Sequence, residues 1–254
     1  LLKPTSGQIK INGISVSDNR RKSTIDVGYL PENLVLYDNL TGRETLQFFV
    51  DLKSASKREV EELLEKLDLK PAADRKVGGY SKGMVQRLAI AQSLIGKPSI
   101  LILDEPTSGL DPEGTSLVKE IVKEYKSKGK TVFFSSHILP NVQEVADRVG
   151  IIRQGKLQAL NSVEKLRENL EMPSKLHISL SDNFERILNQ LEENDMIIGF
   201  YGKDKKLTVK CKREDKMEIL KSIEKQGFEI KDFSTEESDL EDIFLRYTGE
   251  GHNV

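Results

Sequence analysis

Apolar residues change their spacing along the chain, and each spacing predicts a different kind of element. From residue 46 to residue 69 they recur every three to four positions among lysines and glutamates, which predicts amphipathic helices with one apolar face. Residues 82–95 repeat this spacing until Pro98, which blocks continuation of a helix. Residues 99–103 are instead apolar without alternation, as expected for a strand buried on both faces of a parallel sheet.

Shorter patterned segments predict further strands around these helices. Residues 7–13 and 27–30 have the pattern of short strands, and a helix over residues 115–128 is followed by a strand over residues 131–135. Two further apolar segments, 149–153 and 156–159, flank Gln154-Gly155, which predicts a hairpin. We therefore expect an α/β domain over residues 1–170, with a helical insert at about residues 33–98.

A second series of elements begins where the pattern breaks at residues 171–174. The predicted order is strand 176–180, helix 184–193, strands 196–200 and 207–210, helix 215–226 and strand 228–233. This order predicts a small two-layer α+β domain of ferredoxin-like type over residues 171–254. Near the end, Leu240, Ile243, Phe244 and Tyr247 have helical spacing. Core packing is the expected use of these four side chains, with partner docking as the alternative.

Composition excludes several classes of protein. The chain has 254 residues, 37% of them hydrophobic, and no run nears the roughly 18 apolar residues of a membrane-spanning helix. Its one cysteine, Cys211, cannot form an internal disulfide, which indicates a reducing compartment such as the cytosol. The net charge is −2, and the only basic run, residues 20–22, is short. Nucleic acid is therefore not an expected partner.

Candidate chemistry gathers around the apolar strand. Asp104 and Glu105 follow it directly, at the carboxyl edge where parallel sheets bind ligands. Such a pair can hold Mg²⁺ and orient an attacking water in phosphoryl chemistry, although a solvated turn explains it equally well alone. Ser81 opens the helix before the strand, either as a plain cap or with free N–H groups that suit an anion. His137 stands just past the next strand.

Together these segments resemble the nucleotide-binding subunit of ATP-binding cassette (ABC) transporters, over about residues 1–160. Ser81 and Gly83 match the serine and second glycine of the family's Leu-Ser-Gly-Gly-Gln signature, whereas Tyr80, Lys82 and Met84 depart from it. Residues 100–105 resemble the Walker B strand, residues 108–111 the D-loop, and His137 the switch histidine. The resemblance implies a P-loop NTPase-like fold.

The resemblance also implies an ATPase that uses ATP and Mg²⁺. Asp104 would serve Mg²⁺, Glu105 the hydrolytic water and His137 the γ-phosphate. Ser81 and Gly83 would face ATP held by the other subunit of a head-to-tail homodimer. The resemblance further places Asp111, in the D-loop, and Glu32 at the nucleotide.

Two departures from the family bear on nucleotide binding. Glu32 stands where the family usually has glutamine; its carboxylate can approach Mg²⁺ but adds negative charge beside phosphates. The Gly-x-x-x-x-Gly-Lys-Ser/Thr loop that cradles phosphates does not occur in the printed sequence, where residues 109–116 and 21–24 match it only in part. Residues 1–7 resemble the family segment that comes after this loop and its helix, so we expect the native protein to extend upstream. The printed residues alone are then expected to bind ATP poorly and to be inactive.

The end of the chain narrows the expected function. Residues 238–249 resemble the tail of ABC subunits that pair with separate permeases of the ABC-2 exporter type. The sequence therefore predicts an ATP-hydrolysing subunit, attached to the cytoplasmic face of the cell membrane through a permease and driving export. One alternative is a soluble ABC-type ATPase acting on the ribosome or chromosome. Such a protein would be expected to have a long heptad arm or a second cassette, together with a basic surface. Another is a non-catalytic module, which would not need Glu105 and His137.

Overall fold

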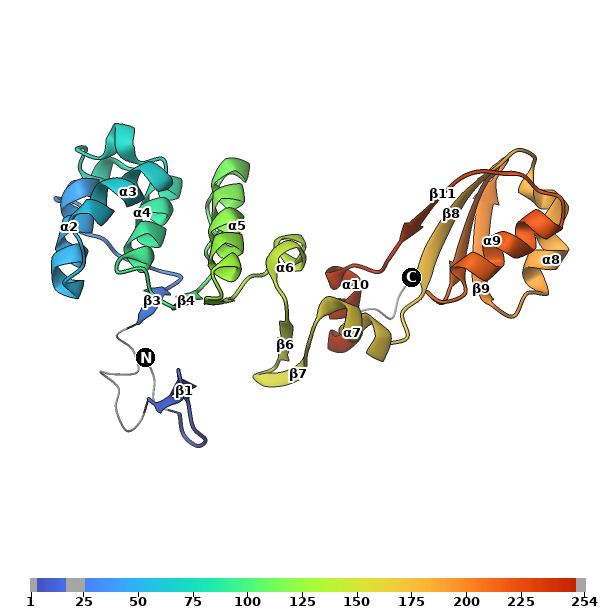
Figure 1. The fold of residues 1–254 in the computed structure, drawn as a ribbon, viewed down its shortest axis with the longest axis horizontal. Helices are drawn as coiled ribbons and strands as arrows, with labels where there is room; N and C mark the ends of the chain where they lie inside the picture. Colours follow the sequence, from blue (N-terminus) through green and yellow to red (C-terminus); the bar gives the residue numbers. More distant parts are fainter. Residues whose placement is uncertain (1–3, 17–25, 250–254) are drawn as a thin grey trace. The chain divides into compact units, whose positions relative to one another are not determined.

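The computed structural model of the protein describes residues 4–16 and 26–249, in two compact units, Leu1–Ile138 and Leu139–Val254 (Figure 1). The basic run at residues 20–22 and the partial loop match at 21–24 lie outside the described residues. Among the described helices, none has both the length and the apolar character that crossing a membrane requires.

The first unit begins with a small hairpin. Strands β1 (Lys10–Ile11) and β2 (Ile14–Ser15) pair antiparallel across Asn12 and Gly13. Both turn residues have positive φ, 49° and 76°, as the tightest hairpin turns require. The prediction of one strand over residues 7–13 was therefore wrong, because the turn falls inside that segment.

A parallel sheet forms the centre of the first unit. Its strands are β3 (Val27–Leu30), β4 (Ile100–Leu103) and β5 (Thr131–Phe134), in the order β3-β4-β5. The strands predicted at these three places are confirmed. The register aligns Leu30, Leu103 and Phe134, so all three strands end at the same edge.

The two faces of this sheet differ in burial. Leu30, Leu101 and Leu103 are at most 2% exposed, on the face that the helices cover. Tyr29 and Phe133, which share the opposite face, are 40% and 69% exposed. In β4 itself, Ile100 and Ile102 on that face are only partly buried, so within the described residues the strand is fully buried on one face only.

The helices predicted between β3 and β4 are confirmed as α2 (Gly42–Lys53), α3 (Arg58–Lys66) and α4 (Lys82–Leu94), with 3₁₀ turns at Lys70–Ala72 and Val77–Gly79. Their apolar sides meet in one core, where Leu46, Leu64 and Leu88 are completely buried. Each such leucine stabilises the fold by about 2 kcal/mol.

Helix α5 (Pro112–Ser127) then joins β4 to β5. It begins three residues before the predicted start, because Asp111 caps it and Pro112 suits its first position.

The second unit begins with a helix and a hairpin, and a helix from the C-terminal end of the chain packs on both. Its elements are α6 (Leu139–Val145), the antiparallel pair β6 (Val149–Arg153) and β7 (Lys156–Asn161), and α7 (Val163–Asn169). The last helix, α10 (Leu240–Thr248), returns to pack on them. Its Leu240 and Ile243 are at most 1% exposed, and the Leu240 N–H donates to Gln143 Oε1 at 2.7 Å. The predicted hairpin is confirmed, and so is packing as the use of the helical spacing in α10.

Between α7 and α10 the chain forms a four-stranded antiparallel sheet with its own core. The elements follow the order β8 (Ser174–Leu180), α8 (Leu188–Glu192) after a 3₁₀ turn at Phe184–Ile187, β9 (Ile197–Lys203), β10 (Lys206–Cys211), α9 (Lys216–Lys225) and β11 (Ile230–Glu236). The spatial order β11-β8-β10-β9 and the βαββαβ connection are those of the ferredoxin-like motif. Alternate residues Leu176 and Ile178 of β8 are buried with Ile219 and Ile223 of α9. The predicted α+β architecture is confirmed.

Along the chain, the second compact unit begins at residue 139, whereas the sequence predicts a domain boundary after residue 170. The difference arises because α10 packs onto residues 139–172 and ties that segment to the C-terminal part. The four-stranded sheet nevertheless keeps a separate apolar core. The domain boundary after residue 170 therefore stays a prediction.

Candidate functional site

The carboxyl edge of the parallel sheet gathers polar residues from three strands. The ladder continues one residue beyond the strands, because the Asp104 N–H donates to the Leu30 carbonyl at 2.8 Å and the Ser135 N–H to the Leu103 carbonyl at 3.0 Å. This pairing fixes the chain at the point where Asp104 leaves β4. Glu32 lies exposed at the same edge, two residues beyond β3.

The two acids after β4 are connected to the segment after β5. The Ser135 hydroxyl donates to Asp104 Oδ1 and accepts the Glu105 N–H at 3.0 Å. His137 Nδ1 lies 3.0 Å from Glu105 Oε2. One hydroxyl and one imidazole therefore hold both carboxylates in a single cluster.

Glu105 occupies an unusual backbone conformation. Its φ is 46°, in the left-handed region that costs a non-glycine residue about 1 kcal/mol or more. The Gln86 amide, from α4, donates to the Pro106 carbonyl at 3.0 Å, and the Ser108 N–H donates to the Glu105 carbonyl at 3.0 Å. These contacts hold the turn. The Glu105 side chain is 19% exposed and that of His137 is 74% exposed, so the carboxylate is recessed while the imidazole is accessible.

A second group of predicted residues surrounds the start of α4. Ser81 is exposed and caps the helix, with its hydroxyl accepting the Met84 N–H at 3.2 Å. Gly83 lies against the loop before α5, because a Cβ there would be 3.5 Å from the Gly109 carbonyl. Gly109 has φ 73°, and a Cβ on it would lie 2.7 Å from Lys82 Cε. The Lys82 side chain, one of the departures from the family signature, therefore packs directly against that loop.

Asp111 links α4 to α5. Its carboxylate caps α5 by accepting the Gly114 N–H at 2.8 Å, and it pairs with Arg87 at 3.2 Å. The Gly114 N–H, with a smaller effect of Arg87, holds the pKa of Asp111 below its ordinary value against desolvation. The Arg87 side chain is only 11% exposed and also pairs with Asp68 at 3.2 Å. Asp111 is therefore a charged, structurally engaged residue.

Tyr80, another departure from the family signature, is explained by packing in the helical insert. Its hydroxyl donates to the Ala72 carbonyl at 2.7 Å, and burial raises the pKa of the phenol. A Cβ on Gly42 would lie 2.2 Å from that hydroxyl, so a larger residue there would displace the Tyr80 side chain. The Arg75 guanidinium stacks 5.3 Å from the Tyr80 ring centroid.

The structure thus brings Asp104, Glu105 and His137 into one cluster and places Ser81, Gly83 and Asp111 around the start of α4 and the loop before α5. Sequence reasoning missed Ser135 and Gln86 as supporting residues. Ser135 had a usable signal, since the parallel register puts it beside Asp104. Gln86 had none, because its role depends on where α4 lies over the 105–106 turn.

The donor set favours a metal ion that arrives with a ligand. Among residues 4–16 and 26–249, no group of three or more His, Cys, Asp or Glu side chains could hold a metal ion. Mg²⁺ in phosphate sites is bound by one or two carboxylates together with phosphate oxygens. Asp104 fits that requirement. The phosphate-cradling loop is not in the printed sequence, so the residues present fit the hydrolytic side of a nucleotide site.

The chain is similar in sequence to known ABC transporter proteins. The sequence profile of the ABC transporter family matches residues 1–108. The ABC transporter ATP-binding protein YxlF of Bacillus subtilis (strain 168) is 34% identical over 253 residues, which cover 97% of this chain and 82% of that protein. The bacitracin transport ATP-binding protein BcrA of Bacillus licheniformis is 32% identical over 253 residues, with 99% and 82% covered.

Solved structures of this kind share the fold. An ATP-binding subunit of an ABC transporter superposes with a TM-score of 0.62 at 30% identity, over 66% of this chain and 72% of that one. The ADP- and phosphate-bound dimer of the ATP-binding cassette MJ0796 gives 0.58 at 24% identity, over 63% and 75%. The chain therefore belongs to the family of ABC transporter ATP-binding proteins, the ATP-hydrolysing subunits of these transporters.

Proposed function

We propose that ATP is hydrolysed at the carboxyl edge of β3-β4-β5, and that this reaction powers export through a separate membrane permease. The observation that carries the site assignment is the connected cluster of Asp104, Glu105, Ser135 and His137. Mg²⁺ bound there would neutralise charge on the phosphates of the nucleotide.

Each residue of the cluster has a separate role in the proposed reaction. Asp104 would hold Mg²⁺, with its carboxylate oriented by the Ser135 hydroxyl. Glu105 would orient the attacking water and accept its proton. His137 holds the Glu105 carboxylate through Nδ1, and its exposed ring would contact the γ-phosphate. Glu32 would approach the metal from the end of β3.

We further propose a head-to-tail homodimer, in which a second copy completes each site. Ser81 and Gly83 lie at the N-terminus of α4, whose free N–H groups and dipole favour phosphate. Among the described residues, no hydrogen bond or ion pair joins them to the Glu105 cluster, which fits a role toward the nucleotide of the partner. Asp111, in the loop against Gly83, would join them.

An exposed apolar patch supports docking on a membrane partner. Val35, Tyr37, Phe48 and Leu52 are 92%, 64%, 47% and 70% exposed, and the Tyr37 and Phe48 rings meet edge-to-face at 6.4 Å. Exposed apolar patches mark interaction sites. This patch lies on α2 and the loop that begins at Glu32, so docking there would connect the permease to the catalytic edge and hold the chain at the cytoplasmic face. Export as the direction is supported by the likeness of residues 238–249 to ABC-2-type subunits.

Affinity purification from membranes of the source cell tests the permease partner. We expect the full polypeptide, as its gene encodes it, to retain a polytopic membrane protein. The double variant Phe48→Ser with Leu52→Ser should release that protein while ATPase activity persists. The matched control is Leu157→Ser, which removes an apolar side chain outside the patch that is 60% exposed, a value between those of Phe48 and Leu52. Retention of ribosomal or chromosomal nucleic acid instead of a membrane protein would overturn this assignment.

The assignment of Glu105 is tested in the full polypeptide as its gene encodes it. Glu105→Gln keeps the shape and the hydrogen bond to His137 but removes the base, so steady-state turnover should fall by about 10²-fold or more. ATP binding, measured by equilibrium titration, should persist. Glu120→Gln, an exposed change on α5, is the control. Unchanged turnover in Glu105→Gln would remove Glu105 from this role.

A further inference from the structure

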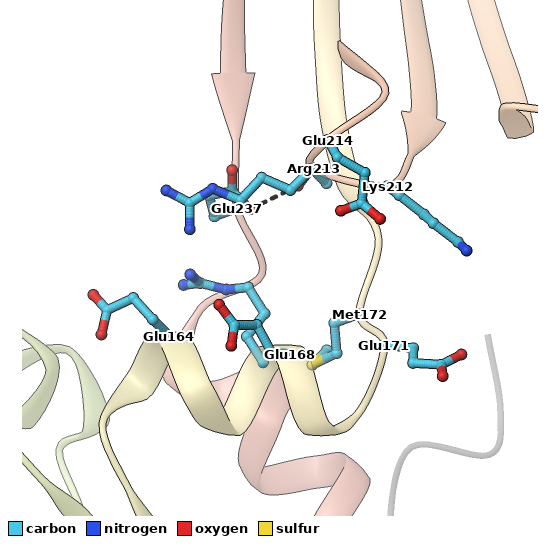
Figure 2. Close-up of a pocket in the computed structure, with 10 residues that line it drawn as sticks. Glu164, Glu168, Glu171, Met172, Lys212, Arg213, Glu214 and Glu237 are labelled. Carbon is cyan, nitrogen blue, oxygen red and sulfur yellow. Dashed lines mark hydrogen bonds between the residues drawn. The ribbon is translucent and has the colours of Figure 1, made fainter.

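A hollow of about 280 Å³ opens in the second unit, beside α7 and the loop between β10 and α9 (Figure 2). Five carboxylates and three basic side chains line it, together with Met172 and Ser174. It lies outside the residues that the proposed ATPase reaction uses. Charges of both signs therefore converge on one cavity that has no assigned role.

Part of the lining is fixed by contacts within the protein. The Glu237 carboxylate pairs with Lys216 and accepts the hydroxyl hydrogen of Ser174 at 2.7 Å. Arg167 donates from Nε and from one Nη to the Ser238 carbonyl at 2.9 and 2.8 Å. Ser174 is 1% exposed. These groups form one wall of the cavity, and their charged side chains already have partners within the protein.

Other charged side chains of the lining are not engaged. Glu168, Glu214 and Arg213 are exposed residues of the lining, and among the described residues no side-chain hydrogen bond or ion pair involves them. In Figure 2, Glu214 extends from the loop and Glu168 rises from α7, so their carboxylates face the hollow from opposite sides. The Arg213 guanidinium lies at one side of the same space. Unlike charges line this cavity without neutralising each other.

We propose that this cavity binds a small amino acid-like molecule that carries one carboxylate and two cationic groups. Carboxylates outnumber basic groups in the lining by five to three, so a ligand with net positive charge is favoured. A cationic side chain would lie between Glu168 and Glu214, and the ligand carboxylate would pair with Arg213, as guanidinium groups do with carboxylates. The volume of about 280 Å³ lies just below the roughly 300 Å³ at which the range for small-ligand pockets begins, so it suits a ligand no larger than an amino acid.

Isothermal titration calorimetry on the whole chain, with L-arginine as the probe, tests the proposal. We expect saturable binding with a dissociation constant of about 1 mM or tighter. Agmatine, which is arginine without its carboxylate, should bind about tenfold more weakly, since it loses the charged pair with Arg213. L-glutamate should give no saturable heat. Absence of saturable arginine binding, or agmatine binding as tight as arginine, would overturn the proposal.

Variants locate the binding. Glu168→Gln with Glu214→Gln should weaken L-arginine binding by about tenfold or more, because both carboxylates that face the cationic group are lost. Arg213→Gln should abolish the preference for arginine over agmatine. Glu192→Gln, an exposed change on α8 outside the lining, is the matched control, and circular dichroism verifies folding of each variant. Unchanged affinity in the double variant would place the ligand elsewhere and contradict the proposal.

Discussion

At the scale of single residues, Ser135 stands out because one hydroxyl touches both acids of the site. It donates to the Asp104 carboxylate and accepts the Glu105 N–H. Glu105 needs such support, since its backbone is held at φ 46°. A small polar side chain thus fixes the two acidic residues relative to each other before any ligand binds. We regard Ser135 as a positioning residue that acts through Asp104 and Glu105.

Removing the Ser135 hydroxyl should therefore impair turnover more than binding. For Ser135→Ala in the full polypeptide we expect kcat to fall by about tenfold, the equivalent of one lost hydrogen bond, with the KM for ATP nearly unchanged. Ser135→Thr should restore kcat. Ser136→Ala is the control, because the Ser136 hydroxyl accepts only the Ile138 N–H in the described structure. A kcat for Ser135→Ala equal to that of the native protein would exclude the positioning role.

At the scale of elements, an ion pair joins the helical insert to α5. Lys66, at the end of α3, and Lys128 both pair with Glu124 on α5. The Lys128 hydrogen bond, followed by that of Lys66, lowers the pKa of Glu124 from 4.5 to about 2. A carboxylate whose pKa is lowered by folding stabilises the folded state above its unfolded pKa. This contribution is present at neutral pH and is lost as the pH falls from about 4.5 to about 2.

Glu124→Gln tests this contribution through its pH dependence. The Lys66 and Glu124 side chains are about one-third exposed and that of Lys128 is 59% exposed, so solvent screening limits the contribution to about 1 kcal/mol. We expect the variant to lose that amount of unfolding free energy at pH 7, measured by urea unfolding, and less at about pH 3. Glu120→Gln on the same helix should show no such trend. A loss for Glu124→Gln that is equal at both pH values would contradict the ion-pair account.

The elements also show what the sequence could predict. Periodicity located α2, α3, α4 and β4 because the apolar residues of each element face one core. The start of α5 was missed because its first turn, Pro112 to Thr115, contains no core residue before Gly114 and depends on the Asp111 cap. The 7–13 segment was misjudged because alternation alone does not reveal a turn at Asn12 and Gly13. Local patterns predict elements, and caps and turns decide their ends.

At the scale of the whole molecule, contacts between residues far apart in the chain could not be predicted from the sequence. Asp104, Glu105 and His137 could be singled out because each follows an apolar strand. That α10 would return to residues 139–172 could not be foreseen, since the Leu240–Gln143 contact spans 97 positions. The charged cavity was missed for the same reason, because its lining comes from segments far apart in the chain. In the proposed function, the Asp104–Glu105–His137 cluster and the residues at the start of α4 act on one nucleotide only when a second copy of the chain is present.

The most direct test of the central claim is a crystal or cryo-electron microscopy structure of the full polypeptide with Mg²⁺ and a non-hydrolysable ATP analogue. The account predicts the metal beside Asp104 and the γ-phosphate beside Glu105 and His137, with Ser81 and Gly83 of a second copy facing the same nucleotide. Nucleotide and metal bound away from the carboxyl ends of β3, β4 and β5 would contradict it.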